Sequence, residues 1–172
     1  DNLGTLFMML ALSKRLSLLD QAVRNDNFGI RYQNFPRDIN GKTIGLLGFG
    51  RIGYEIGRIC RQTFDMQVIV YDPYLADEKK NECLNWMSLV ELKELLSKSD
   101  FISIHVPLTD QTRNMVDEAE LSQMKSDAIL INASRGGVVN ESALVKALQN
   151  NQIAGAGLDV FSEEPVPADN PL

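Results

Sequence analysis

The chain has 172 residues, of which 44% are apolar and 23% charged, and its formal net charge is −6. This apolar fraction is too high for a disordered chain, no apolar run reaches the roughly 18 residues of a membrane span, and the acidic balance argues against nucleic-acid binding. The length suits a single domain with a substantial core.

The first predicted element is a helix that runs from the amino terminus to about Asn25. Its apolar residues recur at spacings of three and four, as in Leu3, Leu6, Phe7, Leu10 and Leu18. The helix is apolar over much of its circumference, which indicates burial on more than one side, inside a fold or at a subunit interface. A polar loop over residues 25–40 is expected to follow.

Beyond that loop, short apolar strands alternate with helices. Strands are expected over 43–47, 67–71, 101–105, 128–132 and 153–159, and helices over 51–62 and 141–149. A short helix is also expected from Asp117, and another from a capping box of Ser88 and Glu91 to about Lys98. This alternation predicts an α/β fold with a doubly wound parallel sheet, a three-layer αβα Rossmann arrangement. Ligands then bind beyond the carboxyl ends of the strands.

The first strand is followed by a glycine-rich loop of the pattern G-x-G-x-x-G, formed by Gly48, Gly50 and Gly53. A strand precedes it and a helix follows it, which is the context that a dinucleotide-binding loop requires. The first glycine permits a tight turn, the second lets the backbone approach a pyrophosphate, and the third lets the helix pack on the strand. The N–H groups at Arg51 and Ile52 are expected to face the anion.

The second strand ends at Asp72, followed by Pro73, 72 − 53 = 19 residues beyond the last glycine of the loop. An acid at this distance accepts hydrogen bonds from the adenosine ribose and repels the 2′-phosphate of NADP, which favours NAD. A turn-forming role before Pro73 is the alternative interpretation of Asp72, and the glycine loop at the right distance favours the cofactor role. S-adenosylmethionine is a competing ligand, because its binding folds also combine a glycine-rich loop with an acid at a strand end.

The later strand ends carry further candidates. His105, the single histidine, is interpreted as a buried residue bonded to backbone rather than as a general base. Arg135, after the fourth strand, suits bidentate binding of a substrate carboxylate, unless a neighbouring loop neutralises it. Glu163 and Glu164 form either a solvated acidic turn or a site where one of them polarises a catalytic base.

Five segments together resemble the D-isomer-specific 2-hydroxyacid dehydrogenases in order and spacing. They span 48–53, 71–74, 105–109, 132–137 and 158–165 and read GFGRIG, YDPY, HVPLT, NASRGG and LDVFSEEP. That family includes D-3-phosphoglycerate, D-lactate, glyoxylate/hydroxypyruvate and formate dehydrogenases. The resemblance covers nearly the whole chain, and it implies that the opening helix packs across a homodimer interface.

The resemblance also implies roles for individual residues. The catalytic pair is Arg135 and Glu164, with Glu164 lying 164 − 135 = 29 residues further on. The NAD contacts implied are Gly48, Gly50, Arg51, Ile52, Gly53, Asp72, Pro73, Val106, Pro107, Thr112, Ala133, Ser134 and Asp159. The general acid/base of the family is a histidine a short way beyond the glutamate, and the chain ends at Leu172 before that position.

The resulting hypothesis is the NAD-binding domain, residues 1–172, of an enzyme that transfers hydride between nicotinamide and a small D-2-hydroxy or 2-oxo acid. The substrate domain and the catalytic histidine are expected outside this chain, which alone should bind NAD(H) and turn over poorly. An NAD(H)-sensing corepressor of the same family is the non-enzymatic alternative.

The cysteine and histidine content bears on disulfides, metal binding and the cellular compartment. Two cysteines, Cys60 and Cys83, make no disulfide framework, and together with one histidine they leave little material for a zinc site. No signal peptide is recognised at the amino terminus. A cytoplasmic protein with reduced thiols, with no metal, nucleic-acid or membrane partner, is expected.

Overall fold

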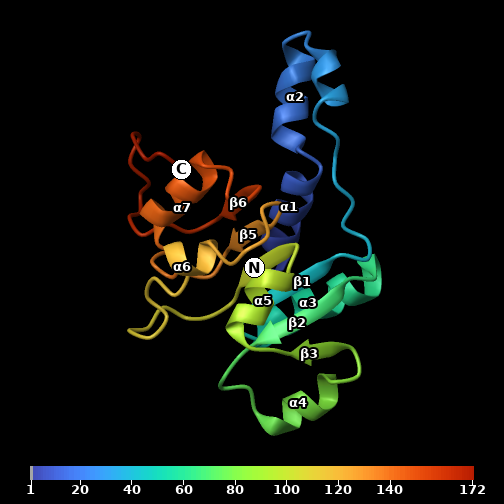
Figure 1. The fold of residues 1–172 in the computed structure, drawn as a ribbon, viewed down its shortest axis with the longest axis vertical. Coiled ribbons are helices and arrows are strands. Elements are labelled where there is room, and N and C mark those ends of the chain that lie inside the picture. Colours follow the sequence, from blue (N-terminus) through green and yellow to red (C-terminus); the bar gives the residue numbers. More distant parts are fainter. Residues whose placement is uncertain (1) are drawn as a thin grey trace.

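The computed structural model describes residues 2–172 and contains one six-stranded parallel sheet (Figure 1). The strand order is β3-β2-β1-β4-β5-β6, so the direction of winding reverses between the adjacent strands β1 and β4. Open sheets of this kind bind ligands beyond the carboxyl ends of the strands at that reversal. The strands are β1 (Thr43–Leu47), β2 (Gln67–Tyr71), β3 (Met87–Leu89), β4 (Phe101–Ile104), β5 (Ile129–Asn132) and β6 (Gly155–Leu158).

The central strands are covered on both faces, which explains why they are apolar without alternation. β1 pairs with β2 and β4, with Gly45 in register with Ile69 on one side and Ile102 on the other. Gly45 leaves room for Leu95 and Ser99, whose side chains occupy the space that a Cβ would take. The helix containing Leu95 therefore lies directly on the sheet.

Helices cover the two faces of the sheet in separate layers. α1 (Asn2–Ser13) and α3 (Arg51–Phe64) pack on one face, and α5 (Leu92–Lys98), α6 (Glu118–Leu121) and α7 (Glu141–Gln149) belong to the other. Each layer has its own buried apolar cluster. The predicted three-layer Rossmann architecture is thereby confirmed, and no helix within residues 2–172 has the length and apolarity to cross a bilayer.

The prediction of one continuous opening helix is wrong, because this segment forms two helices. α1 ends at Ser13, Arg15 adopts a left-handed conformation with φ of 52°, and α2 (Leu16–Arg24) begins beyond it. α2 and the short 3-10 helix η1 (Phe28–Tyr32) project from the body of the molecule as an arm (Figure 1). We call residues 16–35 the arm. Only one residue of α2, Ala22, is buried.

The capping box predicted at Ser88 is also wrong. Ser88 lies in β3, and α5 begins at Leu92 after Glu91, which makes no side-chain cap. The sequence did not predict β3, which has three residues, or α4 (Asp77–Cys83), which is mostly polar and carries little periodicity. The short helix predicted from Asp117 is present as α6, and Asp117 begins it with a capping box: its side chain caps the helix, and Glu120 accepts the Asp117 N–H.

Candidate functional site

The glycine loop after β1 is shaped by close contacts at two of its three glycines. Gly48 has φ of +91°, and a Cβ there would lie 2.8 Å from the His105 carbonyl oxygen. A Cβ on Gly53 would overlap the carbonyl oxygen of Gly48, so helix and loop could not approach as they do. A Cβ on Gly50 would meet no protein atom within 4 Å. Gly50 therefore faces open space, where a ligand can approach the backbone.

The amino terminus of α3 follows this loop directly. The N-cap, Gly50, supplies no side-chain cap, and the first intrahelical bond runs from the Tyr54 N–H to the Gly50 carbonyl at 3.0 Å. The N–H groups of Arg51 and Ile52 precede that bond. A 14-residue helix whose uncapped amino terminus meets an open glycine suits a phosphate, because its N–H groups and its dipole both favour an anion.

Asp72, at the carboxyl end of β2, is held by two backbone donors. Its Oδ2 accepts the N–H of Phe49 at 2.8 Å, and its Oδ1 accepts the N–H of Tyr74 at 3.0 Å. The turn-forming role is thus present, and the same carboxylate is tied to the glycine loop. A carboxylate has about four acceptor positions, so two remain for ribose hydroxyls.

A cleft of about 510 Å³ opens between the loops that follow β1, β2 and β4. It brings together seven of the predicted cofactor residues, which are Gly48, Gly50, Asp72, Pro73, Val106, Pro107 and Thr112. No contact was predicted for five further lining residues, although the first three stand in the motifs YDPY and HVPLT: Tyr71, Tyr74, Thr109, Gln111 and Met115. The Tyr74 hydroxyl donates to Gln111 Oε1 at 2.8 Å, linking the loops after β2 and β4. Their positions after predicted strands were the available signal.

Thr112 stabilises the loop after β4 through its hydroxyl. Its Oγ1 donates to the Pro107 carbonyl at 2.6 Å and accepts the Thr109 N–H at 2.8 Å. These bonds are internal to the loop, so this hydroxyl shapes one wall of the cleft.

His105 directly follows β4 and lines the cleft. Its backbone N–H donates to the Leu47 carbonyl at 2.7 Å, whereas the Nε2 of its side chain pairs with the Ser103 hydroxyl at 2.8 Å. Burial disfavours the charged imidazole and lowers the pKa of His105 to about 4. The ring is therefore neutral at pH 7, and with so low a pKa it is a weak proton acceptor.

A second group of predicted residues follows β5, where the buried Asn132 organises the turn. Its Oδ1 accepts both the N–H and the hydroxyl of Ser134, at 3.1 and 2.9 Å, and its Nδ2 donates to the Arg135 carbonyl at 3.0 Å. Ala133 is partly buried between them. Asn132 was not predicted as a site residue, although it sets the backbone of three that were.

Arg135 projects from this turn as an exposed side chain. Its Nη1 donates to the Ser134 carbonyl at 2.7 Å, and within residues 2–172 no carboxylate lies within ion-pair distance of it. The alternative of a salt bridge to a neighbouring loop is not what the structure shows. The guanidinium is free to bind an anion.

The loops after β5 and β6 are in direct contact. A Cβ on Gly136 would overlap the Phe161 carbonyl, and the Asp159 N–H donates to the Asn132 carbonyl at 3.0 Å. Glu164 is exposed, and its Oε1 accepts the N–H of Phe161 at 2.9 Å. Arg135 and Glu164 thus stand on adjoining loops, outside the lining of the cleft.

The described part of the chain, residues 2–172, contains no group of three or more metal-ligating side chains. The cleft and the two adjoining loops offer backbone N–H donors, the carboxylates of Asp72, Asp159 and Glu164, and the guanidinium of Arg135. This is a set suited to a dinucleotide and a small anion.

Comparison with protein-family models gives a match over residues 6–172 to the D-isomer specific 2-hydroxyacid dehydrogenase, NAD binding domain. Among similar proteins, a glyoxylate reductase of Korarchaeum cryptofilum is 40% identical over 168 residues, covering 96% of this chain and 50% of that protein. A D-3-phosphoglycerate dehydrogenase of Archaeoglobus fulgidus is 35% identical over 165 residues, 96% of this chain and 31% of that protein. The chain therefore spans half, or less, of these relatives.

Among solved structures, the NAD-dependent formate dehydrogenase from Staphylococcus aureus in complex with NAD is similar to the chain with a TM-score of 0.89. The two are 33% identical, and the match covers 99% of this chain and 50% of the other. The likeness thus extends over nearly all of the fold described above.

Proposed function

Because this chain belongs to the D-isomer specific 2-hydroxyacid dehydrogenase family, as its NAD-binding domain, we propose that it binds NAD(H) in the cleft between the loops after β1, β2 and β4. The observation that carries the location is the juxtaposition of open Gly50, the uncapped amino terminus of α3 and the anchored Asp72. The first two suit a pyrophosphate and the third suits a ribose.

The proposed pose follows from this order. The pyrophosphate lies against Gly50 and the N–H groups of Arg51 and Ile52, with Gly48 and Gly53 shaping the turn. The adenosine lies in the cleft among Asp72, Pro73, Val106 and Pro107, on the wall that Thr112 stabilises, and the nicotinamide end lies toward Ala133, Ser134 and Asp159. The support is that all these residues follow the carboxyl ends of neighbouring strands.

Titration calorimetry of the 172-residue chain tests the ligand. We expect saturable binding of NADH and no heat with S-adenosylmethionine, because the family matched is one of NAD-binding domains. Binding of S-adenosylmethionine with indifference to NADH would instead favour the competing ligand, and with it a methyltransferase.

For the whole protein we propose reduction of a 2-oxo acid or oxidation of a D-2-hydroxy acid. The nicotinamide, when bound, supplies or accepts the hydride at the substrate's C2. Arg135 binds the substrate carboxylate and polarises the neighbouring carbonyl, for which its exposed, unpaired guanidinium is suited. Glu164 raises the pKa of a histidine that supplies the proton, and this histidine is proposed outside residues 1–172, because His105 is bonded to Ser103.

The reaction is tested in the complete protein with glyoxylate and hydroxypyruvate. Arg135→Gln should lower kcat/KM by about 100-fold or more and leave the Kd for NADH unchanged, because the charge-assisted hydrogen bond to the substrate carboxylate is lost. A variant with full activity would remove Arg135 from the mechanism. The relatives described above are named as reductases and dehydrogenases, which favours this enzyme over a corepressor.

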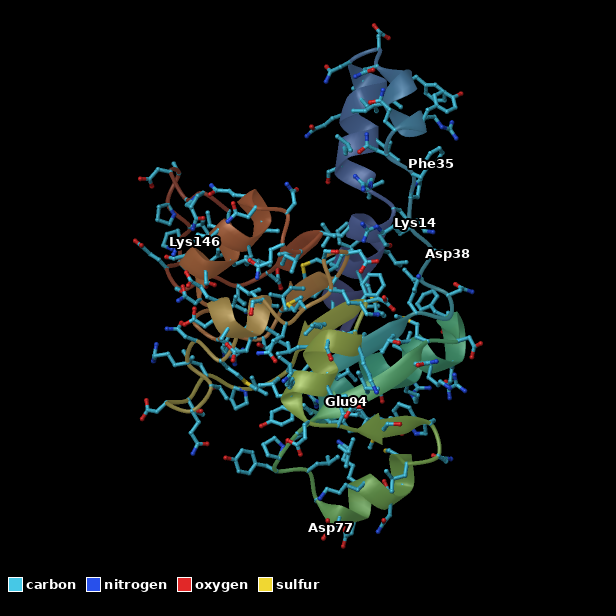
Figure 2. The ribbon with its side chains drawn as sticks, viewed as in Figure 1. Lys14, Phe35, Asp38, Asp77, Glu94 and Lys146 are labelled. Atoms are coloured by element: carbon cyan, nitrogen blue, oxygen red, sulfur yellow. The ribbon has the colours of Figure 1, made fainter. Side chains whose placement is uncertain are left out.

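We further propose that the protein is a homodimer formed through α1 and the arm. Most of the exposed large apolar side chains belong to the first 35 residues, namely Leu3, Phe7, Leu16, Leu18, Val23, Phe28, Tyr32 and Phe35. Figure 2 shows Phe35, the last residue of the arm, lying away from the sheet. A surface of this apolarity is typical of a protein interface.

A reducing compartment, the cytoplasm, is the proposed location. Cys60 and Cys83 are buried and unpaired, and burial raises the pKa of the Cys60 thiol to about 12, which keeps it protonated and unreactive. Cell fractionation should recover the protein with cytoplasmic markers, and recovery with exported proteins would contradict this location.

A further inference from the structure

Phe49, the residue between the first two glycines of the loop, is fully buried although it lies in neither a helix nor a strand. Its N–H donates to Asp72 Oδ2 at 2.8 Å. The position of Phe49 therefore sets two things at once, the path of the loop backbone and the direction of the carboxylate.

Two further aromatic rings hold the Phe49 side chain in place. Ring centroids lie 5.9 Å apart for Phe49 and Tyr54, 5.8 Å for Phe49 and Trp86, and 5.8 Å for Tyr54 and Trp86, so the rings close a triangle. The ring planes are tilted or edge-to-face, the arrangements that aromatic quadrupoles favour. Tyr54 lies in the first turn of α3 and Trp86 lies just before β3, so two separate segments converge on the loop.

A lysine from a third segment covers this triangle. Lys79 of α4 places its Nζ 5.5 Å from the Phe49 centroid and 5.3 Å from the Tyr54 centroid, within the range of a cation–π contact. Within residues 2–172 it has no carboxylate partner within ion-pair distance, whereas Lys80 beside it pairs with Asp77. The ammonium group is thus committed to the two rings.

We propose that Tyr54, Trp86 and Lys79 form a brace for the glycine loop and act as positioning residues for the dinucleotide. This inference rests on the proposed binding of NAD(H). A loop fixed before the ligand arrives does not have to be ordered during binding, so affinity is gained without a contact to the ligand. Because the brace also fixes the bond between Phe49 and Asp72, it contributes to the preference for a free 2′-hydroxyl over a 2′-phosphate.

Three variants of the 172-residue chain separate positioning from stability. Trp86→Leu removes two ring contacts, Trp86→Phe keeps a ring at the site, and Leu144→Ala empties a fully buried position in the opposite helix layer. The Kd values for NADH and NADPH are measured by calorimetry, and the free energy of unfolding by urea titration. Global destabilisation lowers the affinity for both dinucleotides by one factor, so it leaves the ratio of the two Kd values unchanged.

In Trp86→Leu we expect the Kd for NADH to rise about 5- to 10-fold and the ratio of the NADPH to the NADH Kd to fall. Trp86→Phe should keep the Kd for NADH and the ratio of the two Kd values within about 2-fold of the wild type. Leu144→Ala should keep the wild-type ratio. Lys79→Met, which keeps a side chain of similar length at this half-buried position and removes the charge, should raise the Kd for NADH about 2- to 5-fold.

If wild type binds NADH and both Trp86→Leu and Lys79→Met keep its Kd values and ratio, the brace is refuted and the proposed function stands. Loss of both affinities by one factor in Trp86→Leu, as in Leu144→Ala, also refutes the brace. A wild-type chain that binds neither dinucleotide contradicts the proposed function, and the brace with it.

Discussion

At the residue scale, Asp72 combines two tasks in one carboxylate. It accepts the N–H groups of Phe49 and Tyr74, and it stands in the cleft where a ribose is proposed. The sequence predicted its place, from its spacing to Gly53, and both interpretations of its role. It could not predict the bond to Phe49, because that bond depends on how two loops from neighbouring strands meet.

Replacing Asp72 tests its electrostatic role. Asp72→Asn removes the charge and leaves one oxygen, which can accept only one of the N–H groups of Phe49 and Tyr74. Repulsion of the 2′-phosphate is then lost, and the bonds to the ribose weaken. We expect the ratio of the NADPH to the NADH Kd to fall by about 10-fold or more. Calorimetry on Asp65→Asn, at the far end of α3, provides the control. An unchanged ratio in Asp72→Asn would remove cofactor discrimination from this residue.

His105 predicts a pH dependence of stability. Its pKa in the folded protein is about 4, below the ordinary value near 6.5, so the unfolded chain binds more protons between these limits. The contribution of the neutral His105 to the free energy of unfolding is therefore fully present above about pH 6.5 and is lost as the pH falls toward 4. Between pH 7 and pH 5 the loss from this single group is about 2 kcal/mol.

The measurement compares urea unfolding of wild type and His105→Gln at the two pH values. Gln keeps a hydrogen-bonding group for Ser103 but does not titrate, so this part of the pH dependence should vanish. The chain has one histidine, which makes the difference between the two proteins assignable. An identical decline in both would show that His105 is hydrated rather than buried.

At the scale of elements, the sequence predicted the strands that carry the site and most of the helices behind them. β1, β2 and α7 have the predicted bounds, because each is a short periodic or continuous apolar segment. The capping box at Ser88 failed because the edge strand β3 competes for the same residues through its pairing with β2. Such pairing is a tertiary interaction that local pattern does not contain.

Two variants of the glycine loop should have different effects, one on NADH binding and the other on the free energy of unfolding. Gly50→Ala should leave the free energy of unfolding within about 1 kcal/mol of wild type, because its Cβ meets no protein atom and its φ of −66° suits alanine. Its Cβ occupies the space proposed for the pyrophosphate, so NADH binding should weaken by about 10-fold or more. Gly53→Ala should instead destabilise the fold by about 1 to 3 kcal/mol, since its Cβ overlaps the Gly48 carbonyl.

Urea unfolding and NADH titration on both variants check this separation. The opposite order, with Gly50→Ala unstable or with Gly50→Ala binding NADH normally, would mean that the open face of Gly50 is not the pyrophosphate subsite.

At the scale of the molecule, the arm is the feature that the fold alone does not explain. The sequence indicated a helix buried on more than one side, and α1 does lie on β6, with Met8 against Gly157. Phe7 on the same helix is 63% exposed and Phe35 is 69% exposed. The sequence did not predict the break at Arg15 or the course of the arm, because both depend on packing and not on local periodicity.

The proposed homodimer predicts the effect of charge on this surface. Wild type should sediment at twice its 19.2 kDa mass, and the double variant Phe7→Glu and Phe35→Glu should sediment as a monomer, because burying two carboxylates in an apolar interface is unfavourable. Lys146→Glu, on the exposed face of α7, serves as the charge control (Figure 2). A wild-type monomer at all concentrations would refute the interface.

The central claim is that the cleft between the loops after β1, β2 and β4 is the site of NAD(H), and a crystal structure of the chain grown with NAD tests it most directly. The predicted result places the pyrophosphate within hydrogen-bond distance of the N–H groups at Arg51 and Ile52, and a ribose hydroxyl on Asp72. Density for the dinucleotide elsewhere, with this cleft filled by water alone, would contradict the account.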